Sequence, residues 1–135
     1  MSESTTLLGL DIGEKRIGIA RANSIAKLPE PLQTLTNDAG FVDNLKELIY
    51  EHQASQLIVG LPRGLDGQDT KQTQFVLEFT DSLKKNLNLK IDFQDEALTS
   101  VKAKEYLNSS KKPYKKSDID SVSAMFILDD YLKGM

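Results

Sequence analysis

The fold of this chain is decided by the stretch Leu7-Leu8-Gly9-Leu10-Asp11-Ile12-Gly13-Glu14-Lys15-Arg16-Ile17-Gly18-Ile19-Ala20. Its apolar residues form two runs typical of buried strands, and Gly13-Glu14-Lys15-Arg16 between them has the composition of a hairpin turn. Asp11 is the exception, because it places a carboxylate inside the first apolar run. An unpaired buried carboxylate costs several kcal/mol, so Asp11 requires a cation, hydrogen-bond donors or a cleft beside it. The alternative is that Asp11 accepts amide protons of the turn.

Three glycines, Gly9, Gly13 and Gly18, surround Asp11 in this predicted hairpin. Glycine weakens the interior of a strand unless another backbone or a ligand approaches closely. The glycines therefore favour a functional interpretation, in which something lies against the strand surface next to Asp11.

Composition places the chain among ordinary soluble proteins. Its 135 residues, 39% hydrophobic and 27% charged, fit a single domain over residues 1–135. The polar N-terminal residues do not resemble a signal peptide, no apolar run approaches the length of a membrane span, and there is no cysteine. We therefore expect a cytoplasmic protein. The net charge of −3 excludes a uniformly basic surface but allows a local patch that binds polyanions.

Apolar periodicity predicts the other elements. Residues 21–31 are expected to form a loop, since two prolines there cannot lie in a central strand. Strands are predicted over 32–35, 56–60 and 89–93, and helices over 41–53, 70–86, 101–107 and 117–132. The expected helix caps are Asn37 or Asp38, Thr99 or Ser100, and a capping box at Ser117-Asp118-Ile119-Asp120.

This order predicts the α/β class, with a five-stranded mixed sheet whose first three strands are antiparallel and helices on both faces. The carboxylates of Asp11, Asp95 and Glu96 would then lie at one edge of the sheet, where Asp118 and Asp120 could join them. Two carboxylates about 4 Å apart repel by roughly 4 kcal/mol at an effective dielectric of 20. Such a cluster requires raised pKa values or a divalent cation, and oxygen ligands favour Mg²⁺ or Mn²⁺.

Each acid also has a simpler interpretation. Asp120 could be the acid of the capping box, and Asp118 would interact favourably with the helix dipole. Asp95 and Glu96 could be N-terminal acids of the helix that follows them.

Four motifs resemble the YqgF (RuvX) family, in the family's order and over almost the whole chain. They are Leu8-Gly9-Leu10-Asp11-Ile12-Gly13 with Lys15-Arg16-Ile17-Gly18-Ile19-Ala20, Val59-Gly60-Leu61-Pro62 with Asp66-Gly67, Asp95-Glu96-Ala97-Leu98-Thr99-Ser100, and Ile119-Asp120-Ser121. The resemblance implies a ribonuclease H-like fold. It also implies a nuclease acting on precursor 16S ribosomal RNA and related to Holliday-junction resolvases.

By this resemblance the catalytic residues are Asp11, Glu96 and Asp120, and these residues with Asp95 would hold Mg²⁺ or Mn²⁺. The sequence departs from the family at two positions. Ala97 stands where arginine is usual, which removes a cation that could neutralise phosphate, and Asn23 stands where aspartate is common. Arg63 is a candidate to replace the missing arginine.

Basic residues are the expected contacts to the phosphate backbone of a nucleic acid, although charged residues are commonly just a solvated surface. The candidates are Lys15, Arg16, Arg63, Lys111, Lys112, Lys115 and Lys116. The expected partner is precursor ribosomal RNA or branched DNA, without a membrane, and the chain is expected to form at most a weak homodimer.

Three other functions stay open. A Holliday-junction resolvase would use the same site, and phosphate contacts do not distinguish DNA from RNA. An ATP-dependent sugar or acetate kinase has a similar Asp-x-Gly hairpin, but those enzymes resemble a doubled form of this fold. A non-catalytic RNA-binding module for ribosome assembly is compatible with Ala97.

Overall fold

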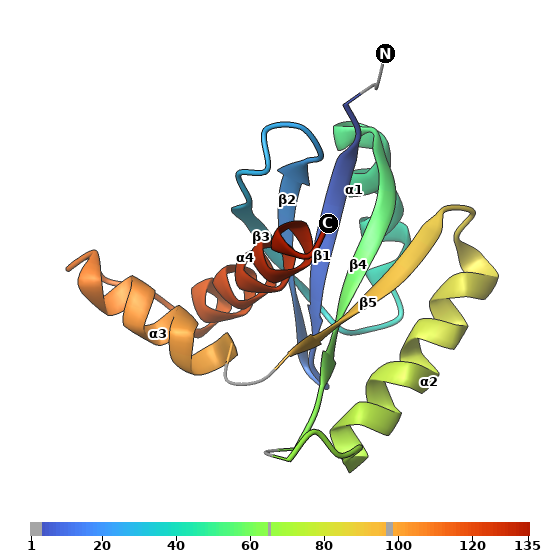
Figure 1. Cartoon of the computed structure of the whole chain (residues 1–135). Helices are drawn as coiled ribbons and strands as arrows, with labels where there is room; N and C mark the ends of the chain where they lie inside the picture. The colour runs from blue at the N-terminus through green and yellow to red at the C-terminus, as the bar shows by residue number, and fades with distance from the viewer. Residues whose placement is uncertain (1–3, 65, 97–98) are drawn as a thin grey trace.

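The chain folds into a five-stranded mixed sheet covered by helices (Figure 1). The computed structural model describes residues 4–64, 66–96 and 99–135. The elements in chain order are β1 (Thr6–Ile12), β2 (Arg16–Asn23), β3 (Glu30–Thr36), α1 (Phe41–His52), β4 (Ala54–Pro62), α2 (Lys71–Asn86), β5 (Lys90–Glu96), α3 (Thr99–Ser109) and α4 (Lys116–Lys133).

The strand order is β3-β2-β1-β4-β5, which places β1 at the centre. β1 pairs antiparallel with β2, and β2 pairs antiparallel with β3. β4 lies parallel to β1, and β5 lies parallel to β4. The predicted α/β class, the strand number and the antiparallel first three strands are confirmed.

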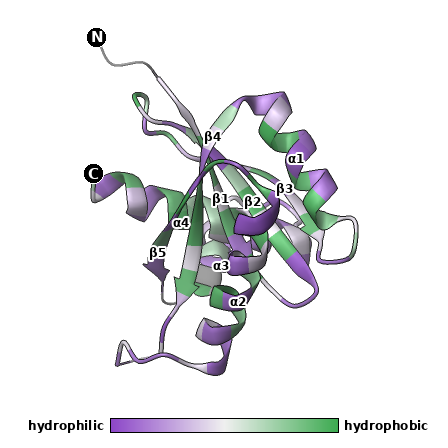
Figure 2. Ribbon diagram, turned by 90° about the vertical axis from the view of Figure 1, so that its right-hand side faces the viewer, coloured by the Kyte–Doolittle hydropathy of each residue, from purple (hydrophilic) through white to green (hydrophobic). Residues whose placement is uncertain are grey.

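The two faces of the sheet carry different helices. On one face, α1 and α2 cover a core that includes Leu8, Leu10 and Ile12 of β1. On the other face α4 crosses the sheet and packs on Leu7 of β1, and α3 packs against α4 (Figure 1). Figure 2 shows hydrophobic residues concentrated in the strands, whereas α1 alternates hydrophobic and hydrophilic residues, as expected for a helix with one buried side. Since alternate residues of a strand share a face, Asp11 lies on the face of α4.

Two strands extend further than predicted. β2 continues to Asn23, because it pairs with the full length of β1 up to Thr6. β3 begins at Glu30 and contains Pro31, which was expected to lie in a loop. That expectation was wrong for a physical reason: β3 is an edge strand, where proline is tolerated.

Two helix starts also differ from the predictions. Gly40 is the N-cap of α1, and Asp38 Oδ1 instead accepts a hydrogen bond from the Gly40 backbone N–H at 2.9 Å. α4 begins at Lys116, and Asp118 Oδ2 accepts from the Lys115 backbone N–H at 2.8 Å. Asp118 is therefore the acid of this cap, and the interpretation of Asp120 as the capping acid is wrong.

The predicted capping role of Thr99 or Ser100 concerns side chains outside the described part of the chain, as does the departure at Ala97. Within residues 4–64, 66–96 and 99–135, no helix is long and apolar enough to cross a lipid bilayer.

Candidate active site

Helix α4 approaches the sheet closely because three strands present glycine beneath it. A Cβ atom at Gly18 of β2 would lie 1.9 Å from the backbone oxygen of Asp120, and one at Gly60 of β4 would lie 2.3 Å from Ile127 Cδ1. Gly9 of β1 lies against the same helix. The close approach that the glycines predict is therefore made by α4 of the same chain, at a distance that no larger residue would allow.

This approach brings the acids of three elements to one region of the sheet. Gly18 is the register partner of Asp11, so the first turns of α4, which carry Asp120, lie next to Asp11. Glu96 ends β5, and its Cδ lies 3.2 Å from the position that a Cβ would take at Gly60. Asp11 and Glu96 thus lie on the sheet face that α4 covers, and Asp120 lies on α4 itself.

The electrostatics of Asp11 reflect this arrangement. Burial, followed by the negative charges of Glu96 and Asp120, raises the pKa of Asp11 to about 8. The protonated carboxyl is favoured because a second and a third negative charge lie within electrostatic reach of a partly desolvated group. A bound cation would reverse this preference.

Arg16 lies within the same group of acids. Its Nε donates a hydrogen bond to Asp120 Oδ2 at 2.7 Å, across 104 positions of sequence. Among the described residues, no group of three or more His, Cys, Asp or Glu side chains is arranged to hold a metal ion. The chemistry of the donors nevertheless fits Mg²⁺ or Mn²⁺, since Asp11, Glu96 and Asp120 provide only carboxylate oxygens.

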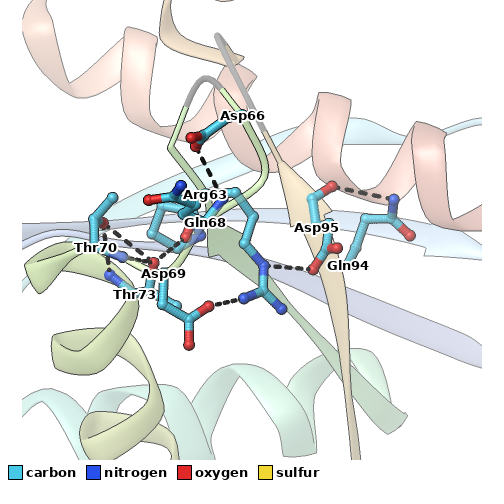
Figure 3. A network of polar contacts seen from close by, with 9 residues as sticks. Arg63, Asp66, Gln68, Asp69, Thr70, Thr73, Gln94 and Asp95 are labelled. Atoms are coloured by element: carbon cyan, nitrogen blue, oxygen red, sulfur yellow. Dashed lines mark hydrogen bonds and ion pairs between the residues drawn. The ribbon is translucent and has the colours of Figure 1, made fainter.

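Asp95 lies apart from these acids. Successive residues of a strand point to opposite faces, so Asp95 faces away from Glu96. Its Oδ1 accepts from Arg63 Nε at 3.2 Å, and Arg63 Nη1 also pairs with Asp69 (Figure 3). The Arg63 backbone N–H further donates to the Glu96 carbonyl oxygen at 3.3 Å. Arg63 therefore ties the loop after β4 to the end of β5, and its guanidinium is held by two carboxylates.

The remaining basic candidates are exposed. Lys15 lies in the hairpin turn between β1 and β2. The other four form a group that we call the basic segment, located between α3 and the start of α4: Lys111, Lys112, Lys115 and Lys116. Lys116 precedes Asp120 by about one turn of α4, or roughly 6 Å along the axis.

Two further basic residues that were not predicted lie close to the basic segment in the sequence. Lys102 and Lys104 are exposed on α3, which leads into the basic segment. The sequence signal for them is the pair of lysines between the apolar residues of this helix, a short distance before Lys111.

The departure at Asn23 lies away from the acids. Asn23 pairs with Thr6, at the opposite end of β1 from Asp11. Its Oδ1 accepts from the backbone N–H groups of Ile25 and Ala26 at 2.9 and 3.1 Å. This side chain therefore stabilises the turn after β2 and takes no part in the group of acids.

Two solved structures of Holliday-junction resolvases share this fold. Thermus thermophilus RuvC in complex with Holliday junction substrate aligns with a TM-score of 0.59 and 11% identity, covering 96% of this chain and 94% of that one. The fowlpox virus Holliday junction resolvase aligns with a TM-score of 0.57 and 15% identity, covering 97% and 100%. These similarities confirm the ribonuclease H-like fold.

Relatives at higher identity share nearly the whole chain. A protein of Sulfurihydrogenibium sp. (strain YO3AOP1) named "Putative pre-16S rRNA nuclease" is 39% identical over 128 residues, which cover 93% of this chain and 88% of that protein. One of the same name from Chloroflexus aurantiacus (strain ATCC 29366 / DSM 635 / J-10-fl) is 38% identical over 130 residues, covering 93% and 85%. The model of the RuvX family, described as "Holliday junction resolvase", matches residues 5–134. Since that match spans nearly every residue from β1 to α4, the chain belongs to the RuvX family.

Proposed function

We propose that this chain is a metal-dependent endonuclease that hydrolyses phosphodiester bonds in structured nucleic acid. The observation that carries the proposal is the convergence of Asp11, Glu96 and Asp120 on one face of the sheet, close enough for the last two to raise the pKa of the first. Charge repulsion of this kind destabilises a fold, and it is typical of sites that bind a cation for function.

The chain's own residues have distinct roles in this mechanism. Asp11, Glu96 and Asp120 would hold Mg²⁺ or Mn²⁺, which supplies activation of the attacking water and neutralisation of the developing charge on the phosphate. Asp11 is central, because β1 lies between β2, on which α4 packs, and β4, which pairs with β5. Lys15 and the basic segment would hold the phosphate backbone on either side of the acids.

The preferred substrate is precursor 16S ribosomal RNA. It is favoured by the names of the relatives at 38–39% identity, which align over 85–88% of their own length. Four-way DNA junctions are the second candidate, and they are favoured by the description of the family itself. The kinase alternative is not favoured, because residues 5–134 match the model of the RuvX family, which is described as "Holliday junction resolvase".

We further propose that the protein acts in the cytoplasm, where ribosomal RNA precursors are processed. We also propose that it forms at most a weak homodimer. Size-exclusion chromatography with light scattering, over a range of protein concentrations, tests the oligomeric state. A dimer that persists at nanomolar concentration would contradict this part of the proposal.

Cleavage assays test the activity. A precursor 16S RNA fragment and a four-way DNA junction are incubated with the protein in EDTA, Mg²⁺ or Mn²⁺. We expect metal-dependent cleavage of the RNA, and a loss of several orders of magnitude in Asp11→Asn and Glu96→Gln. Asp81→Asn, which changes an exposed carboxylate on α2, is the matched control and should cleave normally. Binding without metal-dependent cleavage of either substrate would favour the non-catalytic RNA-binding module instead.

A further inference from the structure

Arg16 forms an ion pair with Asp120, one of the three acids of the proposed site. We propose that Arg16 is a built-in counter-ion of Asp120 which competes with the divalent cation for that carboxylate, so that metal binding releases Arg16 to contact phosphate. This inference rests on the proposed function, since it concerns the same site. It assigns Arg16 a positioning role in the metal-free protein and a substrate contact in the metal-bound protein.

The ion pair joins two residues whose backbones are held in place by the hairpin and by the packing of α4. Arg16 begins β2, and its carbonyl oxygen accepts from the Gly13 backbone N–H at 3.0 Å, which closes the hairpin. Asp120 is fixed by the contact of its backbone with Gly18. The Asp120 side chain is only 20% exposed, whereas the Arg16 side chain is 42% exposed. The acid is therefore held in place, and the arginine has room to leave it.

The two cations cannot use Asp120 in the same way at the same time. Arg16 Nε occupies Oδ2 at 2.7 Å, so a divalent cation bound there would displace the guanidinium or accept a weaker ligand. The positive charge of Arg16 opposes metal binding at Asp120, because the Asp120 side chain is only 20% exposed and water screens the two cations incompletely.

A released Arg16 would lie at the edge of the site, next to the exposed Lys15 in the hairpin turn. Guanidinium groups bind phosphate oxygens through two parallel hydrogen bonds, which a point charge does not reproduce. Metal binding and phosphate binding would then be linked, and the linkage must be reciprocal. Each should strengthen the other through Arg16.

Isothermal titration with Mn²⁺ alone, without nucleic acid, tests the competition. We expect Arg16→Gln to bind Mn²⁺ about 5- to 10-fold more tightly than wild type, at the low end of typical coupling because the pair is partly exposed. Lys15→Gln is the matched control: it removes the same charge from the neighbouring residue, whose side chain forms no ion pair within the described part of the chain, and should change the affinity less than about twofold. Arg16→Lys, which keeps the charge, should lie between the two.

Anisotropy measurements with a labelled RNA hairpin test the release, in EDTA and in Ca²⁺. Wild type should bind the RNA more tightly with the cation than in EDTA, and Arg16→Gln should lose most of this enhancement. Lys15→Gln loses a proposed phosphate contact, so it should bind the RNA more weakly in both conditions but keep the enhancement. Equal Mn²⁺ affinity in the two glutamine variants, or weaker Mn²⁺ binding by Arg16→Gln, would overturn the proposal. Failure of the nuclease proposal alone would give a different result: wild type would not cleave either substrate, but the Mn²⁺ affinities of the variants would still differ as expected. If neither wild type nor Arg16→Gln binds Mn²⁺, both proposals fall.

Discussion

Replacing Asp11 with Asn separates a catalytic carboxylate from a structural one. The substitution keeps the shape of the side chain and removes the charge that Glu96 and Asp120 repel. We therefore expect Asp11→Asn to be more stable than wild type in the absence of metal at high pH, while its nuclease activity is lost. A structural acceptor of turn amides would behave in the opposite way, because a neutral amide oxygen accepts hydrogen bonds less strongly than a carboxylate.

The pH dependence follows from the raised pKa of Asp11. Burial, with the charges of Glu96 and Asp120, raises this pKa from 3.8 to about 8. Between these values the unfolded chain ionises at Asp11 while the folded chain keeps the proton, so the free energy of unfolding falls as pH rises from about 4 to about 8. Four units at 1.36 kcal/mol each set an upper limit of roughly 6 kcal/mol. Partial exposure of the side chain and relaxation of the site reduce the expected effect to about 1–3 kcal/mol.

Urea denaturation in EDTA at pH 4, 6 and 8.5 measures this effect. Asp11→Asn and wild type should have the same free energy of unfolding at pH 4, and the variant should gain about 1–3 kcal/mol by pH 8.5. Asp81→Asn on α2 should stay within about 0.5 kcal/mol of wild type throughout. An Asp11→Asn variant that is 1–2 kcal/mol less stable than wild type at pH 8.5, and that still cleaves RNA, would refute the reasoning.

Three further perturbations test other parts of the structure. Mn²⁺ at a hundredfold excess over its Kd should raise the free energy of unfolding by about 2.7 kcal/mol and the melting temperature by about 5–15 °C. Identical melting curves in EDTA and Mn²⁺ would argue against the metal site. Changing all four lysines of the basic segment to alanine should weaken RNA binding without regard to sequence, and should reduce the slope of log affinity against log salt by up to about 0.9 for each lost phosphate contact; an unchanged slope would exclude this segment from the binding surface. Gly18→Ala should lower the free energy of unfolding by about 3 kcal/mol and abolish cleavage, because the new Cβ would lie 1.9 Å from the Asp120 backbone oxygen. Gly134→Ala, whose nearest contact would be 3.6 Å, should leave both unchanged, and a similar loss in the two variants would contradict this account of Gly18.

The sheet could be predicted from the sequence because each strand carries its own local signal. The hairpin from Leu7 to Ala20 has two apolar runs and a turn, and the strand-helix units that follow have clear changes of period. The errors occurred where tertiary context overrides local preference. Pro31 lies in a strand because that strand is at the edge, and Lys115 is the cap of α4 although lysine is not a favoured N-cap residue.

The separation of Asp95 from Glu96 was accessible to sequence reasoning. Ile91 and Phe93 are the apolar residues of this strand, and they pack against the core that α1 and α2 cover. A strict period of two continues their face to Asp95 and assigns Glu96 to the opposite face. The rule that predicted the strand thus also distinguishes its two acids, and Glu96 is the one on the side of Asp11.

The contact between Arg16 and Asp120 was not accessible in this way, because 104 positions separate the two residues. Charge patterning predicts that a lysine-arginine pair in a turn is exposed and able to bind phosphate. Lys15 is exposed as predicted, whereas Arg16 is only partly exposed and is paired with Asp120. The Arg16 side chain is paired and partly buried because α4 places the Asp120 carboxylate beside it. That placement of α4 depends on Gly18.

The same glycine links the stability of the fold to the chemistry proposed for it. Packing of α4 on the sheet requires its backbone to lie against Gly18, and this contact brings Asp120 toward Asp11 whether or not a cation is present. The helix cannot gain its apolar contacts with Leu7 and Ile58 without also bringing like charges together. Arg16 offsets part of that repulsion in the metal-free protein, and the proton on Asp11 offsets another part. A divalent cation bound to the acids would replace both of these positive charges. In the metal-free protein, Arg16 and the Asp11 proton therefore neutralise the acids that the cation would neutralise in the proposed reaction.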